Sequence, residues 1–401
     1  MSETKQKLIS REYILLTLTF FLVTFGFFAI HNSLPFYVVD KFDMNEQQAG
    51  VVVGVLALGI LSSRFIAGRL AIVLGYRKLL LCSLIGIVIV SFGYLSISSA
   101  MMLRIVRFLH GFFFGLVNNT NMTIVGSIIP KERSGEGVGY YSLGQVVSTA
   151  IGPFIGLSLS MNGNFSVVFL VNTICTGACL LVFPLLRIKN IGVKAKTVSV
   201  DQSGSKLSKF FEFSVLPYAI VAFLLFCNSS GTNSFVAPFA ESIGLEKFVL
   251  YYFPINAAVI ILTRPFVSKL YDKKGPRIVV LPAIGVLALG MLINSQTHQA
   301  YSLLIASALI GFGYGAISSA LLATVVQSVS AERLSVANAT YFMFVDLAAS
   351  MGPMVFGTII YMLGFRGSFI ICFIIILVCA PIYFFVSRKK SAKLTEEIKA
   401  P

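Results

Sequence analysis

Long apolar stretches alternate with short polar connections along most of the sequence. An α-helix rises about 1.5 Å per residue, so roughly 20 apolar residues cross the ~30 Å hydrocarbon core of a bilayer. Twelve stretches approach or exceed this length, and the pattern predicts an all-α membrane protein with about twelve transmembrane helices. The expected spans are residues 12–39, 48–71, 78–97, 102–126, 137–160, 165–187, 214–240, 249–270, 278–296, 301–326, 335–361 and 366–387.

The composition agrees with this pattern. Of the 401 residues, 57% are hydrophobic and only 12% are charged, which is too apolar for a water-soluble monomer. The first stretch is longer than the apolar region of a secretory signal and leads directly into further spans, so we expect it to be retained. The sequence therefore predicts a multi-pass protein of the cell membrane, with the lipid bilayer as its surroundings.

The net charge of +15 follows the connections between spans. Lys and Arg occur before the first span and after each even-numbered span, including the long connection that follows the sixth. The remaining connections are short and mostly neutral or acidic. By the positive-inside rule, the basic connections and both termini are expected in the cytoplasm. Because the charge is not gathered on one face, a nucleic-acid partner is not expected.

The two halves of the chain repeat each other with a constant separation of 200 positions. Such a repeat indicates two pseudo-symmetric six-helix bundles, at residues 1–187 and 214–388, with substrate bound between them. A cytoplasmic linker at 188–213 and a cytoplasmic tail at 389–401 complete the expected organisation. The matching residues include Arg64, Gly75, Arg77, Gly111, Gly115, Gly152 and Pro153 in the first half, and Arg264, Gly275, Arg277, Gly311, Gly315, Gly352 and Pro353 in the second.

Three motifs resemble signatures of the major facilitator superfamily, and within it of bacterial drug:proton antiporters. Residues 68–78 are similar to the cytoplasmic Gly-x-x-x-Asp-Arg-x-Gly-Arg-Arg pattern, 107–111 to an Arg-x-x-x-Gly pattern, and 152–156 to Gly-Pro-x-x-Gly. The resemblance covers nearly the whole chain. It implies the major facilitator fold and, through the third motif, export rather than uptake.

The first and third motifs supply the candidate gating residues. Glycine permits a tight turn, basic side chains cap helix ends or meet carboxylates, and Gly-Pro pairs allow close packing and a kink. This sequence departs from the first motif because Ile72 and Val73 replace Asp-Arg, whereas the second half keeps a carboxylate. The gating candidates are Gly75, Arg77, Lys78, Gly152, Pro153, Asp272, Gly275, Arg277, Gly352 and Pro353.

Three ionisable residues within apolar spans are the candidates for proton coupling. Arg107 lies inside an apolar run, where a guanidinium is costly unless it meets water, a carbonyl or a carboxylate, and the resemblance links it to proton coupling. His110 lies one turn away and titrates near neutral pH, and Asp346 lies inside the eleventh span. We expect Asp346 to bind the proton or a cationic group of the substrate. Structural roles for all three remain open alternatives.

Polar and aromatic residues of the spans are the candidates for substrate binding. His31 and Asn32 in the first span and Asn233 in the seventh belong to helices that line the cavity in the superfamily, and Phe114 and Phe344 supply aromatic surface. Hydrogen bonding between helices, and packing against core or lipid, remain alternatives. The cationic and amide groups are compatible with an anionic or zwitterionic cargo.

Enzyme, nucleotide-binding and metal-binding motifs are absent from the sequence, and its six Cys show no paired spacing. No cofactor or metal is therefore expected, and transport energy should come from an ion gradient. We predict a monomeric secondary exporter of a small organic molecule, driven by proton antiport. A dedicated exporter of a metabolite or of a siderophore- or opine-type metallophore, an importer of the same fold, and a membrane enzyme or receptor stay open.

Overall fold

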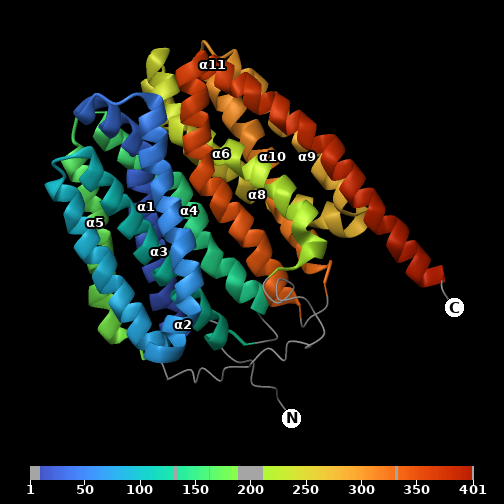
Figure 1. Ribbon diagram of the computed structural model, residues 1–401, viewed down its shortest axis with the longest axis horizontal. Helices are drawn as coiled ribbons and strands as arrows, with labels where there is room; N and C mark the ends of the chain where they lie inside the picture. The colour runs from blue at the N-terminus through green and yellow to red at the C-terminus, as the bar shows by residue number, and fades with distance from the viewer. Residues whose placement is uncertain (1–9, 131–133, 162, 188–210, 330–332, 400–401) are drawn as a thin grey trace. The chain divides into compact units, whose positions relative to one another are not determined.

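A computed structural model describes residues 10–130, 134–161, 163–187, 211–329 and 333–399 (Figure 1). Over this part of the chain the regular structure consists of α-helices and short 3-10 helices, without a β-strand. The all-α expectation is thereby confirmed. Most of the predicted linker, residues 188–210, lies outside the described residues.

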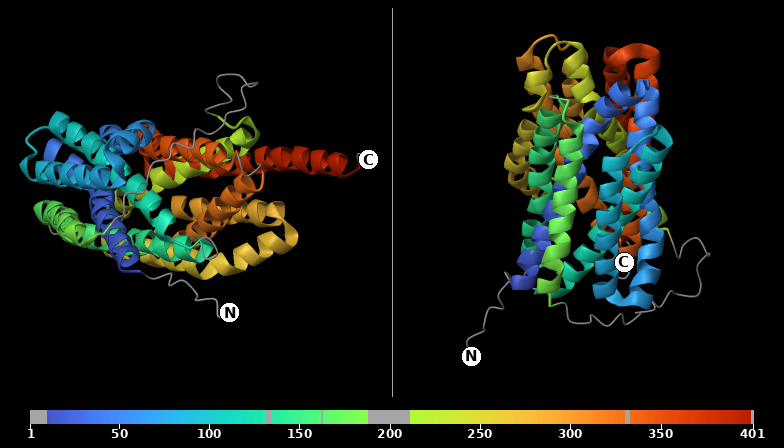
Figure 2. Two further views of the ribbon diagram at one scale, coloured as in Figure 1. Left: turned by 90° about the horizontal axis from the view of Figure 1, so that it is seen from below. Right: turned by 90° about the vertical axis from the view of Figure 1, so that its left-hand side faces the viewer.

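The helices divide into two compact units. The first unit comprises residues Met1–Met44 and Val52–Ser199, and the second comprises Asn45–Val51 and Val200–Pro401. Within each unit the helices run side by side (Figure 2). The first contains α1 (Arg11–Phe42), most of α2 (Glu46–Gly93), η1 (Tyr94–Ser96), α3 (Ala100–Ile128), α4 (Ser134–Ser160) and α5 (Phe165–Val182); the second contains α6 (Leu216–Ser242), α7 (Glu246–Val249), α8 (Tyr252–Lys274), α9 (Pro276–Ser295), α10 (Ala300–Val326) and α11 (Leu334–Lys399).

Ten helical stretches of the described chain are long and apolar enough to cross a membrane. Two of them, Glu46–Ser96 and Val336–Ser387, contain 51 and 52 residues. At 1.5 Å per residue each would extend about 75 Å, more than twice the hydrocarbon thickness. Non-helical dihedral angles at Gly75 and Gly364 interrupt these two stretches. Each stretch is therefore long enough for two of the expected spans, one on either side of its glycine.

Gly75 and its repeat partner Gly275 adopt the same unusual backbone conformation. Their φ angles are 74° and 81°, with ψ angles of 154° and 172°, a region that glycine alone occupies readily. A Cβ atom at either position would meet no atom within 4 Å. The requirement for glycine is therefore conformational, and the repeat preserves the turn that follows the second span of each half.

The core of the first unit is made by apolar faces of α1 to α5. Burial follows from the spacing of large apolar residues on each helix, which places them on the side that faces the neighbouring helices. The fully or nearly fully buried members include Leu16, Val23, Leu56, Leu84, Ile87, Val117 and Ile124. In the second unit, stacked and edge-to-face rings join α6 to α11, through Phe235, Phe239, Phe356 and Phe369.

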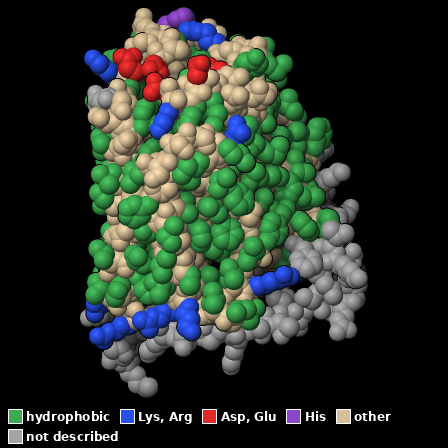
Figure 3. Space-filling view, turned by 60° about the vertical axis from the view of Figure 1, so that its left-hand side comes forward, with side chains coloured by type: hydrophobic (Ala, Val, Ile, Leu, Met, Phe, Trp, Pro, Cys, Tyr) green, Lys and Arg blue, Asp and Glu red, His purple; other side chains and the backbone are tan. Residues whose placement is uncertain are grey.

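The outer surface is strongly apolar. Figure 3 shows a broad band of hydrophobic side chains, with Lys and Arg along one rim and mixed charges along the other. Leu181 and Phe65, for example, are 79% and 70% exposed. Large exposed apolar surfaces of this extent are explained by contact with lipid.

Candidate functional site

Close packing between α2 and α3 positions the candidate residue Arg107. A Cβ atom at Gly111 would overlap the backbone oxygen of Leu56, and one at Gly115 would overlap the hydroxyl of Ser63. Small residues at this spacing let two helix backbones approach closely. Arg107 lies one turn before Gly111 on the same face of α3, so its side chain is pressed against α2 and is fully buried.

The Arg107 guanidinium makes three hydrogen bonds, all to uncharged groups. Nη1 donates to the Tyr94 hydroxyl at 3.5 Å, and Nη2 donates to His31 Nδ1 at 3.5 Å and to the Val53 backbone oxygen at 3.4 Å. These distances are at the long end of the hydrogen-bonding range. The guanidinium is therefore enclosed but weakly bonded.

A further bond joins Tyr94 to His110. The Tyr94 oxygen lies 2.9 Å from His110 Nδ1. Because arginine can only donate, the Tyr94 oxygen accepts from Arg107 while it also shares a hydrogen bond with His110 Nδ1. By the same reasoning His31 Nδ1 accepts from Arg107. The network thus assigns the ring proton of His31 to Nε2 in its neutral form.

The polar cluster made by His31, Tyr94, Arg107 and His110 carries a positive charge that no carboxylate balances in the described part of the chain. Arg107 Nε and His110 Nε2 are buried and make no hydrogen bond there. A buried cation without a counter-charge lowers the stability of the fold and, inside a membrane protein, usually marks a functional position.

Aromatic rings flank this cluster on α1 and α3. Phe27 stacks on His31 with ring centroids 5.2 Å apart, and on Phe114 with centroids 4.5 Å apart. Phe114 also meets His110 edge to face at 6.4 Å. Of the four polar side chains, only His31 is partly exposed, whereas Tyr94, Arg107 and His110 are buried. His31 therefore forms the accessible edge of the cluster.

The Gly-Pro-x-x-Gly motif packs α4 against α1 one turn before His31. A Cβ atom at Gly152 would lie 2.7 Å from Cβ of Phe28, and one at Gly156 would overlap the backbone oxygen of Ala29. Pro153 lies inside α4 between the two glycines. The next candidate along α1, Asn32, is 2% exposed and donates to the backbone oxygen of Phe28 at 3.2 Å.

The remaining binding and coupling candidates lie in the second unit. Asp346 is half-buried on α11. Phe344, also on α11, meets Phe223 edge to face at 6.4 Å, and Asn233 on α6 donates to the Ser229 hydroxyl at 3.4 Å. The proline of the second Gly-Pro pair, Pro353, lies within α11; a Cβ atom at Gly352 would lie 2.5 Å from the backbone oxygen of Cys227.

Several gating candidates are solvent-facing within their own units. Arg77, Lys78 and Asp272 are exposed, and Arg277 donates from Nε to the hydroxyl of Ser387 at 2.9 Å. Val73, which stands where the family motif has a charged residue, is 79% exposed. In the first half, an exposed apolar side chain thus stands where the family motif has a charged one.

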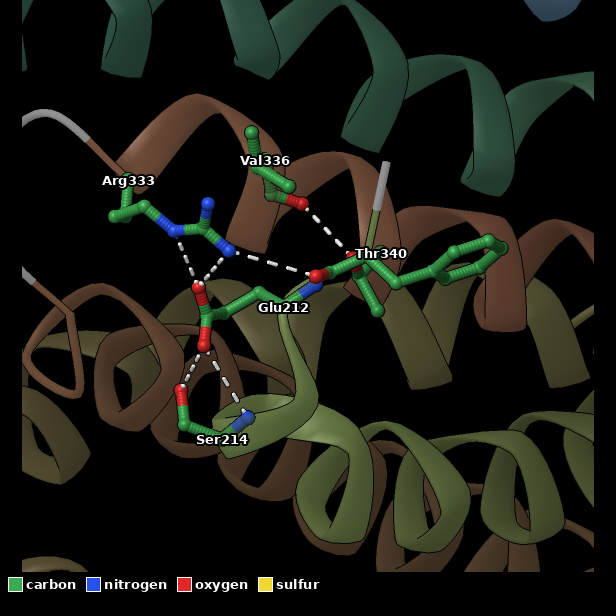
Figure 4. A network of polar contacts seen from close by, with 6 residues as sticks. Glu212, Ser214, Arg333, Val336 and Thr340 are labelled. Atoms are coloured by element: carbon green, nitrogen blue, oxygen red, sulfur yellow. Dashed lines mark hydrogen bonds and ion pairs between the residues drawn. The ribbon is translucent and has the colours of Figure 1, made fainter. Parts of the chain in front are cut away.

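Sequence reasoning did not identify Tyr94, nor the polar network at the start of α6 (Figure 4). One oxygen of Glu212 accepts from Nη2 and Nε of Arg333 at 2.7 and 2.8 Å. The other accepts from the hydroxyl and the backbone nitrogen of Ser214 at 2.7 and 3.3 Å. The Glu212 backbone nitrogen donates to the Thr340 hydroxyl at 3.0 Å.

The electrostatics of this network favour the ionised carboxylate. Burial alone would raise the pKa of Glu212, but the hydrogen bonds from Ser214 and Arg333 outweigh burial and lower that pKa below 4.5. The internal repeat could have indicated this ion pair from the sequence. Glu12 and Arg133 stand 200 positions before Glu212 and Arg333.

Comparison with known proteins agrees with this architecture. The Major Facilitator Superfamily profile matches residues 16–353 and 272–401. Multi-drug resistance efflux pump PmrA of Streptococcus pneumoniae is 22% identical, over 84% of this chain and 86% of its own. Multidrug resistance protein MdtG of Enterobacter lignolyticus is 24% identical, over 89% of this chain and 87% of its own. The crystal structure of nucleoside transporter NupG has a TM-score of 0.74 at 13% identity, covering 94% of this chain and 99% of that one.

Membrane-length helices in two units, with a buried polar cluster, are the architecture of a multi-pass membrane protein, and the family match makes it a membrane transporter. The chain belongs to the Major Facilitator Superfamily. The resemblance carried by the three sequence motifs is thereby confirmed, and members of this family bind small-molecule substrates.

Proposed function

We propose that this transporter exports a small organic molecule from the cytoplasm in exchange for protons. The observation that carries the proposal is the Arg107 cluster, in which charged and titratable groups are kept inside an apolar bundle at a cost in stability. Its relative PmrA is named a multi-drug resistance efflux pump, and its relative MdtG is named a multidrug resistance protein. The Gly-Pro-x-x-Gly motif on α4 favours the same direction of transport.

In the proposed cycle the protein alternates between proton-bound and substrate-bound states. Asp346 and His110 are the titratable candidates, and Arg107 keeps its charge throughout because its guanidinium does not deprotonate in proteins. Two bundles, residues 1–187 and 214–388, alternately expose the binding groups to either side. One charge moving through 100 mV supplies about 2.3 kcal/mol, and a pH gradient adds to this.

The proposal includes the orientation of the chain in the membrane. Residues 188–213, residues 389–401 and both termini lie in the cytoplasm of a monomer, as the distribution of Lys and Arg favours. Gly75 and Gly275, with their turn conformations, and the Gly-Pro pairs of α4 and α11 serve the change between inward-open and outward-open states.

A dedicated exporter of one metabolite or metallophore is the second candidate. The observation that favours it over a broad multidrug pump is the buried cation in the first unit, which suits a cargo of defined charge better than cationic drugs of many shapes. An importer is the main alternative in direction, and the test below separates the two.

The test compares host cells that express the native chain, Asp346→Asn or Asp40→Asn, with Asp40 as an exposed control at the end of α1. Untargeted mass spectrometry of cells and medium should show a compound that moves from cells to medium with the native chain and with Asp40→Asn. In inside-out vesicles this compound should dissipate an imposed pH gradient, and Asp346→Asn should abolish the effect. Enrichment inside cells would identify an importer, while normal proton-coupled transport by Asp346→Asn would exclude Asp346 as the proton carrier.

A further inference from the structure

We propose that Arg107 and His31 form a binding subsite for a carboxylate group of the transported molecule. This inference rests on the proposed function only in assigning the carboxylate to the exported substrate. The binding itself is a property of the first unit and is argued from its residues alone.

The first step is the charge balance of the polar cluster. Arg107 is fully buried, its hydrogen-bond acceptors are two neutral side chains and one backbone oxygen, and its Nε has none in the described chain. The three acceptor distances, 3.4 to 3.5 Å, exceed the 2.7 to 2.9 Å typical of a guanidinium bound to a carboxylate. An incoming carboxylate would supply the missing negative charge and shorter bonds.

The second step compares equivalent positions of the two halves. A side chain that the repeated fold requires should occur in both halves, whereas one that binds a ligand can occur in only one. Ser307 stands 200 positions after Arg107, and its hydroxyl donates to the Tyr252 backbone oxygen at 2.6 Å. Gly231 stands 200 positions after His31 and packs against Phe356, since a Cβ atom there would lie 2.6 Å from that side chain. The repeated architecture therefore forms without a cation or an imidazole at these positions.

The third step concerns access and shape. Nη2 of Arg107 contacts His31, and His31 is the partly exposed member of the cluster. Its Nδ1 accepts from Arg107, so its Nε2–H is the second donor for the other carboxylate oxygen. The buried Phe27 ring stacks on both His31 and Phe114 and so helps to fix the orientation of the imidazole. These features suit a carboxylate group, for which benzoate is a simple monovalent probe.

A structural role is the alternative that the test must exclude. If Arg107 only held α2 to α3, neutralising it would weaken the fold. If it is kept for a ligand, its unbalanced charge lowers the stability of the empty protein, and neutralising it should raise the unfolding temperature. The two roles thus predict changes of opposite sign in the unfolding temperature of the Arg107→Gln variant without ligand.

The experiment measures the unfolding temperature of the full chain in detergent, with benzoate, the neutral benzamide or the cationic benzylammonium added. Benzoate should raise the unfolding temperature of the native protein in a saturable way, whereas the other two should not. Arg107→Gln keeps donor groups but not the charge, and Arg107→Lys keeps the charge but not the forked geometry. Both should weaken the apparent benzoate affinity by roughly 10- to 100-fold, since hydrogen bonds to charged groups contribute that much.

The matched control is Arg366→Gln. Arg366 also lies beside a histidine, His298, but it donates to the backbone oxygens of Ser295 and Thr297 at 3.1 and 2.8 Å. Benzoate should stabilise this variant as it does the native chain. The proposal is overturned if benzoate does not stabilise the native protein, if Arg107→Gln retains the benzoate effect, or if Arg107→Gln lowers the unfolding temperature without ligand.

A second variant, His31→Ala, alters the partly exposed member of the cluster and removes one acceptor of Arg107, so its unfolding temperature without ligand is measured beside its benzoate affinity. It should weaken benzoate binding by about tenfold, which corresponds to one lost hydrogen bond to a charged group; unchanged affinity would remove His31 from the subsite. Because no gradient is used, a failed benzoate effect is distinguishable from a failure of proton-coupled export, which is scored in vesicles.

Discussion

The Tyr94 hydroxyl lies 2.9 Å from His110 Nδ1 and 3.5 Å from Arg107 Nη1, so one phenol oxygen connects the imidazole and the guanidinium of α3 to η1, which follows α2. Both α3 residues are fully buried, and Tyr94 is 1% exposed. Tyr94 is therefore the residue that joins the two α3 side chains of the polar cluster through hydrogen bonds.

Tyr94→Phe should destabilise the protein by about 1–3 kcal/mol, because it leaves His110 Nδ1 and Arg107 Nη1 without this partner in a buried setting. Thermal unfolding in detergent measures the effect. Tyr383→Phe is the matched control, since Tyr383 is fully buried and its hydroxyl makes no hydrogen bond within the described residues. Equal losses for the two variants would show that the Tyr94 bonds contribute little.

Gly111→Ala should also destabilise the fold, by about 1–3 kcal/mol, because the added methyl would overlap the backbone oxygen of Leu56 and force α3 away from α2. Gly126→Ala is the control on the same helix, where a Cβ atom meets nothing within 4 Å. That variant should be neutral or stabilise by up to about 1 kcal/mol through helix propensity. A tolerated Gly111→Ala would mean that the helices can separate without loss.

The membrane architecture was predictable because each of its causes is local in sequence. Apolar runs of bilayer length specify spans without knowledge of any partner, and the 200-residue repeat located the turns at Gly75 and Gly275. The proximity of Arg107 and His110 was also visible, since the two lie one turn apart on one helix. Gly364, whose dihedral angles are non-helical, likewise stands between the expected spans 335–361 and 366–387.

The polar partners could not be predicted because they depend on packing between distant segments. Arg107 donates to the backbone oxygen of Val53. Every residue carries such an oxygen, so the sequence contains no sign of this contact. Tyr94 lies near the end of the predicted span 78–97 and belongs to no motif, so its hydrogen bonds to α3 become visible only in the folded structure. The pair of Glu212 and Arg333 joins residues 121 positions apart, and only the repeated Glu and Arg positions could have suggested it.

The glycine turns give a third prediction. Gly75→Ala and Gly275→Ala should each cost about 1–3 kcal/mol, because both residues occupy backbone conformations that are nearly restricted to glycine. The two effects should add in the double variant, since the turns lie in different units. Gly68→Ala on α2, where a Cβ atom has open space, is the control for thermal unfolding in detergent. A loss at Gly68 as large as that at Gly75 would point to a shared effect of the added methyl instead of backbone strain.

The last prediction concerns pH and the network at the start of α6. The pKa of Glu212 is lowered in the folded protein relative to 4.5, so the ionised carboxylate contributes stability above pH 4.5. This contribution is lost as the pH falls through the lowered pKa, because protonation weakens the bonds to Arg333 and Ser214. The variant Glu212→Gln should therefore be slightly less stable than the native chain at pH 7, and the difference should shrink as the pH falls below 4.5.

Unfolding temperatures across this pH range test the assignment. Glu246→Gln is the control, since Glu246 lies in the first turn of the short helix α7, away from the α6 network. Its stability difference from the native chain should not follow the same pH course. The partial exposure of the ion pair between Glu212 and Arg333 keeps the expected effect small, and salt should reduce it further. A stability difference between the native chain and the Glu212→Gln variant that grows on acidification would contradict the lowered pKa, because it would require a carboxyl group that is stabilised in its protonated form.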